Sequence, residues 1–132
     1  MKQSLVEITE HRGPGYKPLV YFENWRVAIL NFDPEKFTRE KVPYLERHNE
    51  TDEVFVLLAG QCTLYIGDGE GSEAGCIETL KMEPNRLYNV KKGVWHNLSG
   101  SEDMVLLIVE NADTSKSNSD FCPITTDMLP ED

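Results

Sequence analysis

The segment that begins at Glu46 places ionisable side chains directly before an unbroken apolar run. Glu46 and His48 share one face of an extended segment, because successive side chains of a strand alternate. A polar turn of four residues follows, and Glu53 then opens the apolar run. If the chain folds back there, Glu53 joins Glu46 and His48. Two carboxylates and an imidazole on a hydrophobic wall could form a metal site, an acid/base site or a buried polar network.

Composition narrows the class of protein. A chain of 132 residues suits one domain, residues 1–132, with a core that needs no disulfide or metal to fold. Acidic residues number 23 against 13 basic ones, a net charge of -10, so we expect no nucleic-acid partner and no anionic membrane surface. The sequence has neither a bilayer-spanning apolar segment nor the apolar core of a secretory signal, and we expect a cytoplasmic protein. The three cysteines form no close pair and are expected to be free thiols.

Strands must position the ionisable groups. Short segments rich in β-branched and aromatic residues recur between Gly, Pro and Asn turns, which predicts an all-β sandwich or barrel with few or no helices. The barrel core is expected over residues 19–110, and residues 111–132 read as a polar C-terminal tail with a few apolar residues that could dock on the barrel. Residues 54–58 are apolar on both faces, which predicts a homodimer. Residues 62–66 are expected to pair with that strand in a hairpin.

Two further stretches contain glycine but differ in chemistry. Residues 67–75 hold four of the nine glycines and three acids, without the Lys-Ser/Thr of a phosphate-binding loop, so they are expected to form a solvent-exposed hairpin loop. Residues 91–97, Lys-Lys-Gly-Val-Trp-His-Asn, bring a second histidine, His96, next to another predicted strand.

Together these motifs resemble the cupin superfamily. His48, Glu53 and Gly60 have the spacing of the second half of the first cupin motif: histidine, four residues, glutamate, six residues, glycine. Gly93 and His96 match the second motif, in which glycine precedes histidine by three residues, although a lysine stands where proline is usual. The resemblance covers residues 42–110. It implies a double-stranded β-helix, a small jelly-roll barrel whose pocket is lined by both motifs, and it implies dimers.

The resemblance also implies a metal-ligand set. His48, Glu53 and His96 match three of the four family ligands, and Glu46 stands where the family has its first histidine. Two carboxylates and two imidazoles are competent to hold a divalent ion such as Mn, Fe, Ni or Zn. Glu46 is also the candidate catalytic base if it is not ligated. Without metal, His48 and His96 could be pocket histidines that bond to carboxylates.

The remaining candidates concern the ligand. Tyr44 and Trp95 could form an aromatic wall against a ring or sugar face, and Lys91 could attract an anionic substrate into an acidic molecule. The leading hypothesis is a metal-assisted enzyme, an isomerase, lyase or oxygenase, that acts on a small polar or carboxylated molecule. The alternatives are a non-catalytic cupin that binds a small ligand and a structural dimer without metal.

Overall fold

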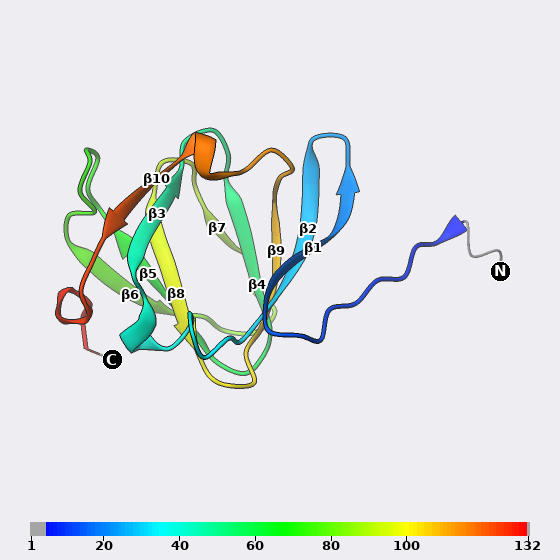
Figure 1. The fold of residues 1–132 in the computed structure, drawn as a ribbon, viewed down its shortest axis with the longest axis horizontal. Helices are drawn as coiled ribbons and strands as arrows, with labels where there is room; N and C mark the ends of the chain where they lie inside the picture. The colour runs from blue at the N-terminus through cyan, green and yellow to red at the C-terminus, as the bar shows by residue number, and fades with distance from the viewer. Residues whose placement is uncertain (1–4, 132) are drawn as a thin grey trace.

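Two antiparallel sheets face each other across the interior of the molecule (Figure 1). The computed structural model describes residues 5–131. Sheet A has the strand order β1-β2-β9-β4-β7, and sheet B has the order β10-β3-β8-β5-β6. The bounds are β1 (Gly15–Phe22), β2 (Trp25–Asn31), β3 (Tyr44–His48), β4 (Glu53–Ala59), β5 (Cys62–Gly67), β6 (Ile77–Lys81), β7 (Tyr88–Val90), β8 (Trp95–Gly100), β9 (Val105–Asn111) and β10 (Ser119–Pro123).

The predicted all-β class is confirmed. Beyond residue 14, the described part of the chain has the 3-10 turns η2 (Arg39–Lys41) and η3 (Lys116–Asn118), which lie in connections between strands, and η4 (Thr126–Met128), which follows β10. No helix of the described residues is long and apolar enough to cross a bilayer. The exposed loop between β5 and β6 joins two paired strands, as the glycine-rich sequence of residues 67–75 predicts.

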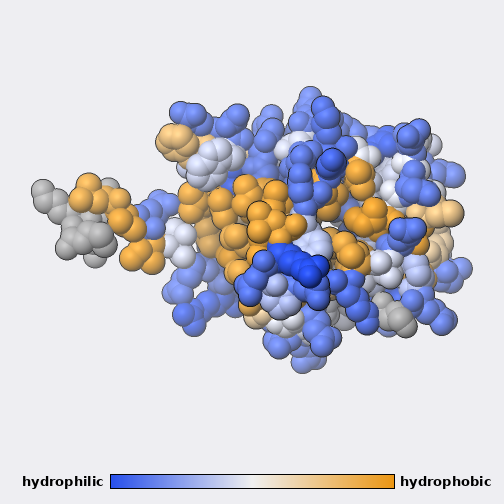
Figure 2. Space-filling view, turned by 180° about the vertical axis from the view of Figure 1, so that it is seen from behind, coloured by the Kyte–Doolittle hydropathy of each residue, from blue (hydrophilic) through white to orange (hydrophobic). Residues whose placement is uncertain are grey.

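Alternation along β4 and β9 divides sheet A into an inner and an outer face. Phe55 and Leu57 of β4 pack with Leu106 and Ile108 of β9 in the core, where each is at most 2% exposed. The intervening positions of the same strands are also apolar, and they lie on the outer face. That face appears in Figure 2 as part of a broad hydrophobic patch beside the root of the N-terminal segment. Within this single chain, the apolar side chains on the outer face are therefore not fully buried, and Leu58 is 52% exposed.

The predicted hairpin between β4 and β5 is wrong. β4 pairs with β7 and β9 in sheet A, whereas β5 pairs with β6 and β8 in sheet B. The two-residue connection carries the chain from one sheet to the other, and Gly60 makes this possible with a φ of 71°. A Cβ atom at Gly60 would lie 2.7 Å from backbone atoms of Asp103 and Met104. A short link between strands therefore turns a corner of the barrel here.

The barrel extends beyond both ends of the core expected from the sequence. β1 begins at Gly15 instead of residue 19, and β10 adds a strand to the edge of sheet B from within the expected tail. β10 pairs with β3 along its whole length, from Ser119 opposite His48 to Pro123 opposite Tyr44. The strand was missed because Ser-Asp-Phe-Cys-Pro has no apolar alternation and ends in proline, which only an edge strand tolerates well.

Candidate metal centre

Three strands bring the candidate ligands together from both sheets. Glu46 and His48 lie on the same face of β3, and His96 of β8 is the direct register partner of Glu46. Glu53 begins β4 in the opposite sheet. The convergence predicted from the sequence thus occurs, but Glu53 joins the other three residues across the barrel interior and not from a strand beside β3.

Both imidazoles meet one carboxylate oxygen. His48 Nε2 lies 3.0 Å and His96 Nε2 lies 2.9 Å from Glu53 Oε1. The two ring centroids are 5.2 Å apart, and the ring planes are inclined to each other by 68°. Glu46 is less tightly placed, since its Oε1 lies 3.9 Å from His48 Nε2. Glu53 is therefore the centre of the cluster and Glu46 its outer member.

Contacts on the far side of each ring fix its orientation. His96 Nδ1 donates to the carbonyl oxygen of Val94 at 2.9 Å, because a carbonyl can only accept. His48 Nδ1 lies 2.8 Å from the Ser119 hydroxyl of β10. The backbone N–H of Gly93, which has a φ of 81°, donates to His48 O at 2.8 Å and ties the second motif to the end of β3. Both rings are thereby held with Nε2 toward the pocket, the arrangement in which histidine binds metal.

Burial and charge oppose each other in this cluster. Burial alone would raise the pKa of Glu53, but hydrogen bonds and charge from His48 and His96 lower it overall, to about 2. Burial alone would lower the pKa values of both histidines, and their hydrogen bonds to Glu53 raise them overall. The pKa of Glu46 is raised by burial, against the opposing charges of the two histidines. Glu46 is thus the carboxylate of the cluster that accepts a proton more readily than usual.

The spacing of the donor atoms fits a divalent ion. Ligand atoms at about 2.1 Å from a metal and at right angles to each other are about 3.0 Å apart, close to the separations of Glu53 Oε1 from the two Nε2 atoms. Ligand atoms of Glu46, His48 and His96 also lie within 4.8 Å of one another. The types and the spacing of the donor atoms are therefore compatible with a bound metal ion. The contacts of Glu53 with the two histidines are equally compatible with direct hydrogen bonds.

Glu110 is a buried neighbour of this cluster that sequence reasoning missed. It is the cross-strand partner of Glu53, and its carboxylate lies within 4.8 Å of ligand atoms of His48 and Glu53. Glu110 Oε1 accepts from Tyr16 at 2.7 Å and from Nη2 of Arg26 at 2.8 Å. The pKa of Glu110 is raised, first by burial and then by the charge of Glu53. The alternation of Leu106, Ile108 and Glu110 along β9 is the sequence signal that places it inside the barrel.

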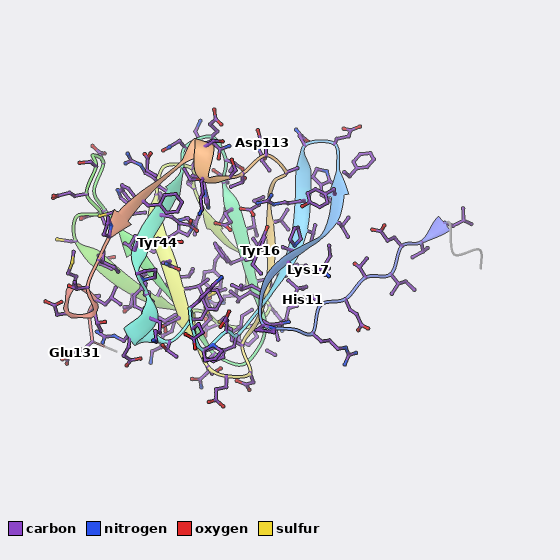
Figure 3. The ribbon with its side chains drawn as sticks, in the orientation of Figure 1. His11, Tyr16, Lys17, Tyr44, Asp113 and Glu131 are labelled. Carbon is purple, nitrogen blue, oxygen red and sulfur yellow. The ribbon has the colours of Figure 1, made fainter. Side chains whose placement is uncertain are left out.

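These groups line one cavity of about 660 Å³ between the two sheets. Tyr44 of β3 and Tyr16 of β1 lie on opposite sides of it (Figure 3). Its deep wall is apolar, with Phe55 and Ile108, and a cavity of this size and lining is typical of a small-molecule site. Tyr44 is therefore placed where the sequence expects a pocket residue.

Two other expected pocket residues lie elsewhere. Trp95 precedes His96 on β8 and so points to the opposite face of the strand, where it is 1% exposed in a second apolar cluster beneath the guanidinium of Arg47. Lys91 is an exposed residue of the turn before β8 and does not line the cavity. Neither Trp95 nor Lys91 is therefore a residue of this cavity, contrary to the prediction from the sequence.

Comparison with solved structures identifies this architecture. The chain resembles a cupin-2 domain-containing protein from Shewanella frigidimarina, with a TM-score of 0.53 and 18% identity over 82% of this chain and 86% of that chain. KdgF from Halomonas sp. has a TM-score of 0.56 and 14% identity over 77% and 81% of the two chains. A uridine-bound variant of Streptomyces Pac13 has a TM-score of 0.60 and 12% identity over 92% and 90%. The chain has the cupin fold. No protein-family model and no curated protein matches this cupin-like chain in sequence.

Proposed function

We propose that this cupin-fold protein binds one divalent metal ion through Glu46, His48, Glu53 and His96, and that a small polar or carboxylated molecule binds beside the ion in the cavity. The observation that carries the proposal is the orientation of the His96 ring. With Nδ1 donating to Val94 O, Nε2 faces the point where His48 and Glu53 also converge, and a cation that displaces the proton between Nε2 and Glu53 would bind there. Mn, Fe, Ni and Zn all accept such a mixed set.

Glu46 is the residue that gives the site catalytic capacity. A bound divalent ion supplies polarisation of a carbonyl or hydroxyl oxygen of the ligand. Glu46 is partly exposed to the cavity, its pKa is raised, and it is the donor least tied to the cluster. When Glu46 is not on the ion, it is therefore the group placed to take a proton from a ligand carbon, a step that isomerisation and elimination share. Isomerase, lyase and oxygenase chemistries are all proposed, and the similar structure of Pac13, a nucleoside dehydratase, supports the lyase.

A second candidate function follows from the same contacts. Glu53 already satisfies both imidazoles by direct hydrogen bonds, so the cluster can also be a closed polar network at the floor of a ligand-binding pocket. Under this alternative the protein is a non-catalytic cupin that binds a small molecule without metal. It predicts stabilisation by ligands that a chelator does not change.

Metal analysis separates the two candidates. Protein purified without a metal-affinity tag is expected to carry about one divalent ion per chain, and His96→Ala is expected to reduce this tenfold or more. His11→Ala, a change at a histidine outside the cavity, serves as the matched control and should keep the wild-type metal content. Equal and negligible metal in all three proteins contradicts the metal site, and a thermal-shift panel of polar and carboxylated compounds, with and without chelator, then tests the alternative.

A second copy of the chain is the proposed partner of the outer face of sheet A. This face gathers apolar side chains from three central strands, without an acid among them: Val27, Ile29, Val54, Val56, Leu58, Val105, Leu107 and Val109. In a chain of net charge -10, a face without acids is where two copies can approach at least electrostatic cost. It is three strands wide and about six residues long, roughly 300 Å² at the usual strand spacing and rise. A standard interface needs about 800 Å² from each partner, so the face supplies less than half.

The N-terminal arm, residues 5–14, is proposed to supply the rest. It leaves the start of β1 and extends away from the barrel on the side of sheet A (Figure 1). Leu5 is 73% and Ile8 87% exposed, while the root of the arm is held by Asn31, which donates to His11 O and Gly13 O. An arm fixed at its root, with uncovered apolar side chains, fits the flank of a partner docked on the outer face.

Sedimentation velocity tests this dimer. The wild-type protein is expected to sediment as a dimer, and Val56→Lys with Leu107→Lys as a monomer, because a buried unpaired lysine opposes association. Leu80→Lys, at an exposed apolar residue of β6 in sheet B, is the control and should remain dimeric. Deletion of residues 1–10 should weaken association at least tenfold. A wild-type monomer at about 100 µM, far above the Kd of a stable dimer, overturns the proposal.

A further inference from the structure

The cavity continues well beyond the candidate metal centre. Tyr44, Glu46 and His48 alternate along β3 and all line it, so the lining follows the strand for about 13 Å at the usual rise. Lys41 also lines the cavity and lies up to about 16 Å before Glu46 along an extended chain. A ligand that contacts Glu46 therefore has room to reach a second, distant group of side chains.

That distant end, termed here the remote end, is cationic and aromatic. Lys36 and Lys41 line it and are exposed, and within residues 5–131 neither forms an ion pair within 4.0 Å. Phe121 of β10 and Tyr44 form an edge-to-face pair there, 5.0 Å between ring centroids. Glu35 is the acidic side chain that lines the same end, so two cations face one anion.

Backbone contacts hold this remote end in place. Lys36 N and Phe37 N donate to Asp33 O, and Lys41 N donates to Thr38 O, which builds the connection from two successive turns. Phe37 O accepts from Gly100 N of β8. The lysines thus project from a segment that is anchored to the barrel, and only their side chains need to be ordered when a ligand binds.

We infer that the remote end is an anion subsite, and that the ligand is an elongated molecule with a carboxylate or phosphate at one end and hydroxyl or carbonyl oxygens at the other. Lys36 and Lys41 attract the anionic group at the remote end. Beside the candidate metal centre, Glu46 and Glu53 repel it, the Arg26 guanidinium is already paired with Glu110, and Lys116 is the one further lysine of the lining, so charge favours the anion at the remote end. The aromatic pair provides a face for the sugar or ring between the two ends. The inference rests on the proposed pocket ligand but not on the metal.

Calorimetric titration with three sugars tests the subsite: glucose 6-phosphate, glucuronate and glucose, at constant ionic strength. The first two carry the anion as phosphate and carboxylate, and glucose is the neutral control. At least one anionic sugar is expected to bind at least tenfold more tightly than glucose. The double change Lys36→Glu with Lys41→Glu should abolish this preference, a loss of at least tenfold, because two exposed attractions become repulsions.

The control is a pair with the same change in net charge. Lys17 of β1 (Figure 3) and Lys81 of β6 are exposed and line no part of the cavity, so Lys17→Glu with Lys81→Glu should change affinity by less than threefold. Equal binding of neutral and anionic sugars, no binding of either anion at about 10 mM, or an equal loss in the control pair overturns the subsite. Metal content should be the same in both lysine pairs and the wild type. A failure of the metal proposal would therefore show in metal analysis while the lysine-dependent preference remains.

Discussion

Removal of the Arg26 guanidinium tests how charge is balanced at the floor of the cavity. The Arg26 side chain is 15% exposed and that of Glu110 4%. Arg26 donates to Glu110 through Nε and Nη2, and to the carbonyl oxygens of Ala112 and Thr114 through Nη1 and Nη2. Arg26→Met leaves a buried carboxylate without its cation and two carbonyls without donors, a class of change that destabilises strongly.

The size of the loss follows from how Glu110 can respond. In the variant, Glu110 can lose its unpaired charge by binding a proton. Protonation of a carboxyl with an ordinary pKa near 4.5 costs about 1.4 kcal/mol for each pH unit above that pKa, which is about 3 kcal/mol at pH 7. The two carbonyls add about 1 kcal/mol each. We therefore expect Arg26→Met to lower the free energy of unfolding by about 5 kcal/mol at pH 7 and about 3 kcal/mol at pH 5.

The sign of this pH dependence is specific. A carboxyl whose folded pKa lies above its unfolded value destabilises the fold increasingly as pH rises from the unfolded pKa toward the folded pKa, so the loss is larger at pH 7. Adding Glu110→Gln removes the titrating group but keeps an acceptor for Tyr16. The double variant should lose about 2 kcal/mol at both pH values. Urea denaturation of the chelator-treated wild type, Arg26→Met and the double variant measures the free energy of unfolding of each protein. A loss under 1 kcal/mol in Arg26→Met, or a double variant no more stable than Arg26→Met at pH 7, refutes the reasoning.

Two other predictions follow from backbone conformation and thiol burial. Gly93→Ala should cost about 1 kcal/mol, for a positive φ with open space at the Cβ, whereas Gly60→Ala should cost at least twice as much because its Cβ meets backbone at 2.7 Å. Equal midpoints of the two variants in thermal unfolding would contradict this account. Burial raises the pKa of the Cys62 thiol to about 12, so iodoacetamide at pH 8 should label exposed Cys76 and spare Cys62, and peptide mass spectrometry that finds both labelled equally fast would contradict it.

The sequence was informative where local pattern decides structure. Alternation on β3 placed Glu46 and His48 on one face, and the motif spacing brought Glu53 and His96 to them. These inferences succeeded because side-chain alternation and ligand spacing are properties of short segments. The glycines of both motifs also have a physical role here, since Gly60 and Gly93 adopt positive φ angles at the corners that align the strands.

The sequence did not reveal which distant segments of the chain pair with each other. The link between β4 and β5 has the length of a hairpin turn, and only the packing of Gly60 against the backbone at Asp103 shows that it joins two sheets. Arg26 and Glu110 are 84 residues apart, so nothing local reveals their ion pair. Trp95 was wrongly predicted to line the pocket because it is next to His96 in sequence. Adjacent residues of a strand point to opposite faces, so Trp95 lies on the other face of β8.

Anomalous diffraction from crystals of tag-free protein tests the metal centre most directly. The account predicts one anomalous peak in the cavity, about 2.0 to 2.3 Å from Nε2 of His48, Nε2 of His96 and an oxygen of Glu53, with Glu46 as the fourth protein donor. Data collected on either side of the absorption edges of Mn, Fe, Ni and Zn identify the ion. The contradicting result is a map without a peak in crystals grown with these ions present, in which both imidazoles still bond directly to Glu53.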